Sequence, residues 1–130
     1  MRVPIKVYLN EGPDNYFGFH NDFADEPRLR LAAAFDITVL EIDTMPGTDW
    51  PMRALNEVFE QLNIGGEAGV PATDWTRQYR AERNRSLSVG DVVVVGETAW
   101  SCDSYGWSKV QADALTEAIA RFNTEGPAHR

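Results

Sequence analysis

The chain has 130 residues, of which 43% are hydrophobic and 25% are charged. These proportions are typical of a single folded domain spanning residues 1–130, and they exclude a largely disordered chain. The formal net charge of −8 disfavours general electrostatic attraction to nucleic acid or to an anionic membrane. The one cysteine, Cys102, cannot form an intrachain disulfide, which favours a reducing compartment. We also find no signal peptide and no apolar run near the about 20 residues of a membrane span, so we expect a cytoplasmic protein.

Two alternating apolar patterns in the first third of the chain predict β-strands. The first covers residues 2–10, and Pro4, which lacks an N–H, places this strand or its start at a sheet edge. The second runs from Leu29 to about Ile42, with a bulge expected near residues 39–40, where the apolar phase shifts. Between them we expect a short returning strand at residues 16–19 and a polar loop at 21–27.

The middle of the chain predicts two helices. Asp49 is a suitable N-cap ahead of Pro51, and apolar residues then follow at helical spacing until Gly65 and Gly66 end the helix. Thr73 is expected to cap a second, short helix that carries Trp75 and Tyr79 on one face.

The last third of the chain predicts two further strands and a terminal helix. Four consecutive valines at 92–95 indicate a strand buried on both faces, followed by a hairpin turn at 96–97 and a strand at 98–103. The segment 108–111 matches a capping box, so we expect the terminal helix to begin there. One face of that helix carries Leu115, Ala118, Ile119 and Phe122, and residues 124–130 are expected to fray.

Three motifs in order along the chain resemble the YodL-like domain family. They are Leu55-Asn56-Glu57-Val58-Phe59 with Asn63 closing the helix, Arg85-Ser86-Leu87-Ser88-Val89-Gly90-Asp91-Val92-Val93, and Cys102-Asp103-Ser104-Tyr105-Gly106-Trp107. The resemblance covers about residues 52–110, and the interval 65–84 is longer than in the family. It implies a chain from a phage, a plasmid or an integrative element, and a domain without established catalytic residues. Segments 9–13 and 16–18 are also similar to small actinobacterial and actinophage proteins.

The segment 75–85 is the strongest candidate for a binding surface. Its residues 77–85 carry a net charge of +3 within an acidic chain, and two aromatic residues lie nearby. Arginines and aromatics together bind phosphates and stack on bases, and they also anchor protein interfaces. The simpler alternative, which we favour, is a surface helix with its aromatics packed inward and its arginines paired with carboxylates. The candidate partner-binding residues are Trp75, Arg77, Tyr79, Arg80, Arg83, Arg85, Tyr105 and Trp107.

Other chemistry has weaker support in the sequence. Cys102 and His20 would need an aspartate to form a nucleophilic triad, but a cysteine inside an alternating strand is more typical of a small core residue. The histidines, His20 and His129, are far apart, and the acidic residues at 22–26 lack the spacing of a calcium loop. Because no glycine-rich phosphate loop is present either, we expect no metal, no cofactor and no catalytic residue.

These patterns together predict an α+β domain. We expect a curved, mainly antiparallel sheet of four to six strands with two to three helices packed on it. We expect the chain to be a non-enzymatic protein-binding module of a phage or mobile element that acts on a host protein. The alternatives are nucleic-acid binding through residues 77–85, or an acidic DNA mimic that inhibits a restriction enzyme. The expected core residues are Phe35, Leu55, Phe59, Leu62, Val93, Val95, Trp100, Leu115, Ile119 and Phe122.

Overall fold

A computed structural model describes residues 2–12, 27–39, 47, 49–67, 69–104 and 106–126. In chain order its elements are β1 (Arg2–Asn10), β2 (Leu29–Thr38), α1 (Trp50–Ile64), α2 (Asp74–Ala81), β3 (Val92–Val95), β4 (Thr98–Asp103), β5 (Gly106–Val110) and α3 (Ala112–Glu125). The five strands form one open antiparallel sheet in the order β2-β1-β3-β4-β5. This confirms the predicted α+β fold. The predictions for residues 13–26, 40–46, 105 and 127–130 lie outside the described residues.

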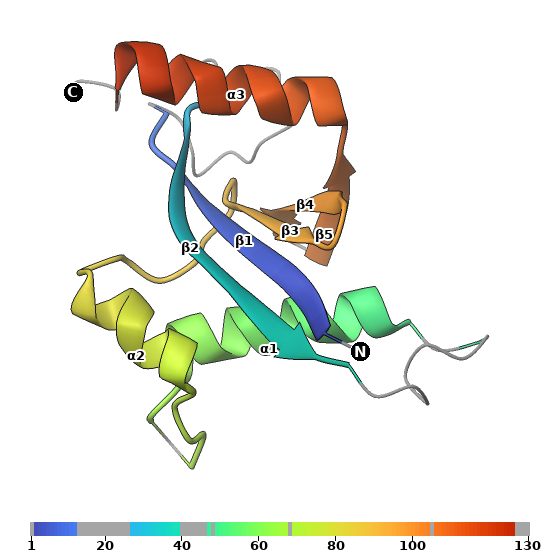
Figure 1. Cartoon of the computed structure of the whole chain (residues 1–130), viewed down its shortest axis with the longest axis vertical. Coiled ribbons are helices and arrows are strands. Elements are labelled where there is room, and N and C mark those ends of the chain that lie inside the picture. The colour runs from blue at the N-terminus through green and yellow to red at the C-terminus, as the bar shows by residue number, and fades with distance from the viewer. Residues whose placement is uncertain are drawn as a thin grey trace.

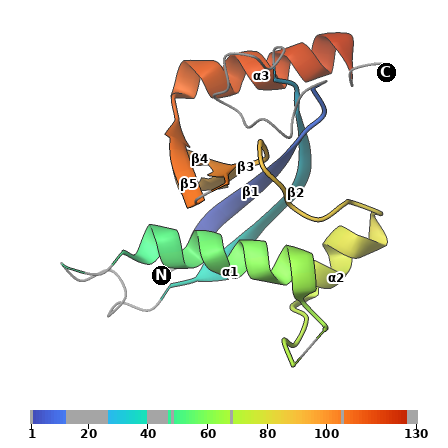
Figure 2. The same ribbon diagram turned by 180° about the vertical axis from the view of Figure 1, so that it is seen from behind.

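The sheet separates two helical layers. Figure 1 shows α3 on one side of the long β1–β2 ribbon and α1 with α2 on the other, and Figure 2 shows the same layers from behind. Alternate residues of β1 supply the two cores, because successive side chains of a strand point to opposite faces. Val3, Ile5, Val7 and Leu9 belong to the core under α1 and α2, whereas Tyr8 belongs to the core under α3. In the described residues, no helix has the length and apolar character needed to cross a membrane.

Strand β1 is a central strand of the sheet, so the prediction that the whole strand lies at a sheet edge is wrong. It pairs with β2 on one side and with β3 on the other. Pro4 is accommodated because the ladder with β3 begins only at Ile5. At that point the chain leaves β3 through the turn at Gly96, whose amide donates to the Pro4 carbonyl at 2.9 Å. Only the start of β1 therefore extends beyond its neighbour.

Strand β2 contains a bulge that the sequence pattern places elsewhere. Val7 pairs with Ala33 and Tyr8 pairs with Leu31, so Ala32 is the extra residue between these two pairs. The bulge reverses the alternation: Ala32 is buried, and the Leu31 residue is 51% exposed. Leu31 therefore faces solvent although it alternates in step with Ala33 and Phe35.

Two of the three helices begin at the N-cap side chain that the sequence predicts. The Asp49 carboxylate accepts a hydrogen bond from the Met52 amide at 3.3 Å, and the Thr73 hydroxyl accepts one from the Thr76 amide at 3.1 Å. Both caps were predicted. The capping box predicted at 108–111 is wrong. Residues 108–110 lie in β5, where they pair with residues 99–101 of β4, and α3 begins only at Ala112. Gly106, with a φ of +134°, begins this additional strand.

Most of the predicted core residues lie in one of the two cores. Leu55, Leu62, Val93 and Val95 are buried, and Phe35, Phe59 and Trp100 are partly buried against the same core. Leu115 and Ile119 are partly buried under α3. Phe122 is only half-buried and joins neither cluster. Helix α3 therefore packs on the sheet mainly through residues 114–119.

Candidate functional site

Helix α2 turns both of its aromatic side chains toward the sheet. The Trp75 ring lies parallel to the Phe35 ring of β2, with 4.2 Å between the ring centroids and 6° between the planes. Tyr79 is 1% exposed, and its hydroxyl donates to the carbonyl of Arg85. Burial raises the pKa of Tyr79 to about 12, so it stays protonated at neutral pH. A Tyr79 ring in this position is not available to stack on a nucleic-acid base.

Two of the α2 arginines hold the loop that precedes the helix. Arg77 donates to the Ala72 carbonyl at 2.9 Å and also pairs with Asp74. Arg80 donates to the carbonyl of Gly65, directly after α1. Both side chains keep exposed surface. Arg83 follows the helix in the left-handed region, with a φ of 61°, and its side chain makes no polar contact within the described residues.

The guanidinium of Arg85, whose side chain is 39% exposed, is bound to a buried carboxylate. The guanidinium makes two hydrogen bonds to the Asp91 carboxylate, at 2.6 and 2.8 Å, and the Asp91 side chain is 1% exposed. Hydrogen bonding to Asp91 raises the pKa of Arg85. The same carboxylate accepts from the backbone amides of Asn10 and Ser88, both at 2.8 Å. These hydrogen bonds tie the end of β1 to the loop that enters β3.

Asn63, which is part of the motifs that resemble the family, binds the backbone of Leu87 through its side chain. Its side-chain amide donates to the Leu87 carbonyl at 3.2 Å and accepts from the Leu87 amide at 2.7 Å. Gly90 and Asp91 likewise exchange backbone hydrogen bonds with Cys102 in β4. The motif residues at 63, 85–91 and 102 therefore hold one region of the fold together.

A groove lies between β2 and α2 and has a volume of about 360 Å³. Ala33, Ala34 and Phe35 form its strand side. Its helix side carries the rings of Trp75 and Tyr79 and a polar row made of Asp74, Gln78 and Glu82. The members of this row are four residues apart, so they share one face of the helix. This spacing is visible in the sequence, but the opposing strand is not.

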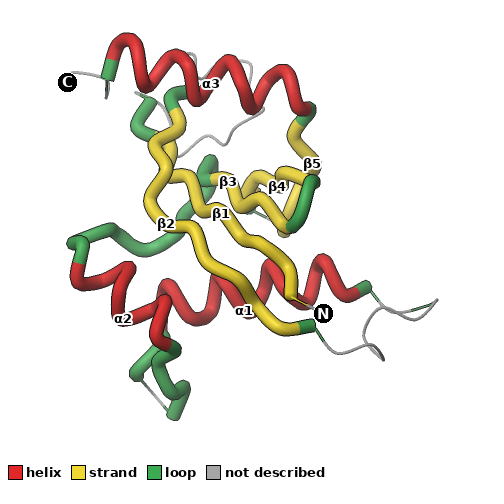
Figure 3. Tube along the Cα trace, in the orientation of Figure 1, coloured by secondary structure: helices red, strands yellow, loops and turns green. Residues whose placement is uncertain are grey.

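The two groups of candidate aromatic residues do not form one surface. Trp107 lies in β5, at the opposite edge of the sheet from β2. There it packs edge-on against Phe59 of α1, with ring centroids 6.1 Å apart, and its indole N–H donates to Asn56 at 3.2 Å. In the strand order, β1, β3 and β4 lie between these edges, and Figure 3 labels each strand along the tube. Tyr105, the remaining candidate, lies outside the described residues.

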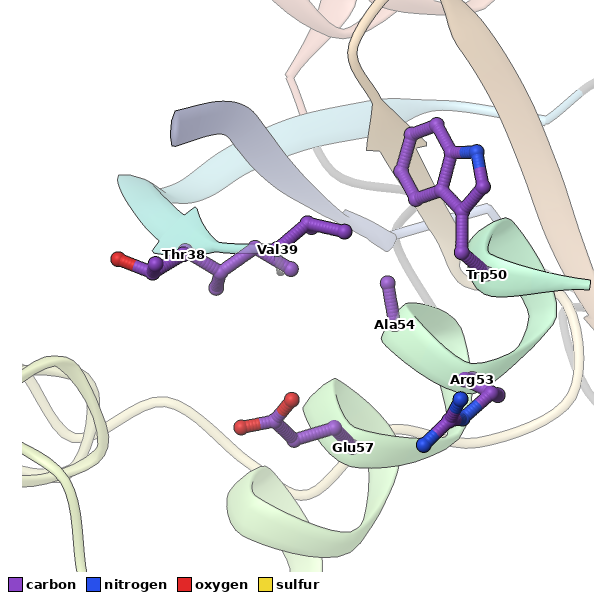
Figure 4. A pocket seen from close by; sticks show the side chains of 7 residues that line it. Thr38, Val39, Trp50, Arg53, Ala54 and Glu57 are labelled. Atoms are coloured by element: carbon purple, nitrogen blue, oxygen red, sulfur yellow. The ribbon is translucent and has the colours of Figure 1, made fainter. Parts of the chain in front are cut away.

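A second hollow of about 210 Å³ lies where β2 ends beside the start of α1. Figure 4 shows side chains that line it, with Thr38 and Val39 on one side and Trp50, Arg53, Ala54 and Glu57 of α1 on the other. Its charged groups are one guanidinium and one carboxylate. None of the described residues that line it is a cysteine, a serine or a histidine.

Cys102 is a poor nucleophile in this environment. The residue is 7% exposed, and burial, together with the charges of Asp91 and Asp103, raises the pKa of its thiol to about 11. His20, the proposed partner in a triad, lies outside the described residues. Among the described residues, no group of three His, Cys, Asp or Glu side chains is placed to hold a metal ion.

We expect the Cys102 thiol to resist thiol reagents at pH 7–8 while the protein is folded. Because its folded pKa lies above the ordinary value of 9, the folded state binds this proton more tightly. The thiol's contribution to stability is therefore complete below about pH 9 and is lost as the pH rises toward about 11. Thiolate absorbance at 240 nm, with the Cys102→Ser variant as blank, measures the titration. Ionisation below pH 8 would contradict the structure and support an activated thiol.

Comparison of the chain with protein-family models, with curated proteins and with solved structures gives no match. The resemblance to the YodL-like domain family therefore rests on the three quoted motifs.

Proposed function

We propose that this chain is a non-enzymatic protein-binding module and that it binds its partner in the groove between β2 and α2. The observation that carries the proposal is the composition of this groove. A half-buried aromatic pair, Phe35 and Trp75, lies beside a strand at the edge of the sheet. Large aromatic residues in a partly desolvated recess are typical anchors of protein interfaces.

Nucleic-acid binding through residues 77–85 has less support from the geometry. Stacking on bases requires accessible aromatic rings next to free cations. Tyr79 is buried, and Arg85 is bound to Asp91. Arg77 and Arg80 donate to backbone carbonyls of the loop before α2, and Arg83 lies beyond the end of the helix.

The origin of the partner is a proposal from the motif resemblance alone. If the chain comes from a phage or another mobile element, its partner is a protein of the host cytoplasm. Actinobacterial cells are the first source to examine, because segments 9–13 and 16–18 are similar to actinobacterial and actinophage proteins.

Affinity capture from a nuclease-treated actinobacterial lysate tests the proposed function. We expect the wild-type chain to retain a host protein and the Gln78→Arg variant to lose it, because the larger cation fills the groove. Gln111→Arg is the matched control, since Gln111 is exposed and lies next to α3, on the other face of the sheet. Retention that disappears with nuclease, or that is unchanged in Gln78→Arg, would contradict the proposal.

A further inference from the structure

We infer that the groove takes an extended, cationic segment of a partner protein, which adds to the sheet as a sixth strand beside β2. This inference rests on the proposed function and specifies the chemistry of the partner. Strand addition to an exposed sheet edge is a common mode of peptide recognition, in which backbone hydrogen bonds give affinity and side-chain contacts give specificity.

The register of the sheet shows which backbone groups of β2 are available. The Pro4 carbonyl points toward β3, where it accepts from Gly96. Because backbone groups alternate sides along a strand, Ile5 then points toward β2 and pairs with Phe35. The N–H and C=O groups of Ala34 and Asp36, which flank Phe35, therefore point away from β1.

These outward groups have no hydrogen-bond partner among the described residues. The nearest contact on this edge is at Ala32, whose carbonyl accepts from the Asn84 side chain at 3.4 Å. Asn84 also accepts from Arg30 at 3.2 Å. On this edge the Ala32 carbonyl is thus already hydrogen-bonded, whereas the outward backbone groups of Ala34 and Asp36 are available for an added strand. The groove lies beside Ala34.

The side chains that line the groove define the chemistry of the added strand. One face of that strand would meet the apolar pair Phe35 and Trp75. The same face would also meet Glu82 and Asp74, of which Asp74 is already paired with Arg77. None of the described residues that line the groove is a lysine or an arginine. An apolar residue and a Lys or Arg on the same face of the strand, two positions apart, complement this lining.

A second copy of the chain is a poorer occupant of the groove. Pairing of two β2 edges would bring together two grooves that each hold the carboxylate of Glu82, in chains of net charge −8. Like charges placed across an interface oppose association. The acidic lining therefore favours a cationic partner over self-association.

The first test selects peptides from a random 12-residue display library on the immobilised chain. We expect selected peptides that alternate, with an apolar residue and a Lys or Arg on one face, and that no longer bind the Gln78→Arg variant. A scrambled peptide of the same composition controls for non-specific attraction to an acidic protein. Glu82→Lys should weaken binding by about two- to fivefold, and the exposed Glu117→Lys on α3 should not.

Two measurements on the best selected peptide test strand addition directly. The amides of Ala34 and Asp36 should exchange with solvent much more slowly when the peptide is bound, whereas the Phe35 amide, already paired with β1, should change little. Methylation of single peptide amides should weaken binding about tenfold at alternate positions only.

The outcomes separate this inference from the proposed function. Peptides that bind in the groove but tolerate methylation at every position would overturn strand addition and leave protein binding intact. If the selected peptides are acidic, or if the chain forms a dimer through β2, the inference that the partner segment is cationic is wrong. If selection yields no peptide, the inference fails, while the capture experiment still decides whether a folded partner binds.

Discussion

Replacing Asp91 with alanine is expected to lower the free energy of unfolding by about 2–4 kcal/mol, because it removes the buried carboxylate that accepts hydrogen bonds from two backbone amides, and an unsatisfied buried donor costs about 1–3 kcal/mol. The Asp91 side chain is 1% exposed. Its loss leaves the Arg85 guanidinium and the backbone amides of Asn10 and Ser88 without their acceptor. A domain of this size has a total stability of about 5–15 kcal/mol, so the variant should approach the limit of folding.

Urea denaturation of the wild type and variants measures this effect. Asp36→Ala is the matched control, since Asp36 forms an exposed pair with Arg2 at 3.8 Å, and loss of such a pair costs about 1 kcal/mol or less. In a double-mutant cycle, Arg85→Met should cost much less in the Asp91→Ala background than alone. Equal effects of Asp91→Ala and Asp36→Ala, or full additivity in the cycle, would show that the Arg85–Asp91 pair contributes little.

The elements that depend on neighbouring residues were predictable from the sequence. Asp49 and Thr73 act within three residues, through their side chains and the following amides. The alternation of apolar residues in β1 and the run of valines in β3 also indicate which strand residues are buried. Each of these signals is complete within one short segment, so no knowledge of the rest of the chain is needed.

The candidate site depends on contacts between distant segments, which local patterns do not contain. The groove exists because β3 pairs with β1, a partnership across more than 80 residues that leaves β2 at the edge. The same pairing brings Asn10 to Asp91. Arg85 was grouped with the α2 arginines by charge alone, although its partner lies six residues further along in the chain. Trp107 was grouped with Trp75 by residue type, and the strand order separates them.

Leu55→Ala is expected to lower the free energy of unfolding by about 2–5 kcal/mol, the range for large-to-small changes in a protein core. Leu55 is completely buried between α1 and the sheet. Leu31→Ala is the matched control, because it deletes the same atoms at a residue that is 51% exposed, and we expect a change within about 0.5 kcal/mol. The measurement is the urea midpoint at unchanged denaturant slope.

The comparison of these two leucines also tests the bulge at Ala32. In an unbroken strand, Leu31 would share the inward face of Ala33 and Phe35, and its truncation would carry the cost of a core substitution. The register shift between the Val7 and Tyr8 pairs places Leu31 outside instead. A loss of 2 kcal/mol or more in Leu31→Ala, about that of a core leucine, would therefore contradict the bulge. It would also shift the register in which Ala34 and Asp36 present their backbone groups to the groove.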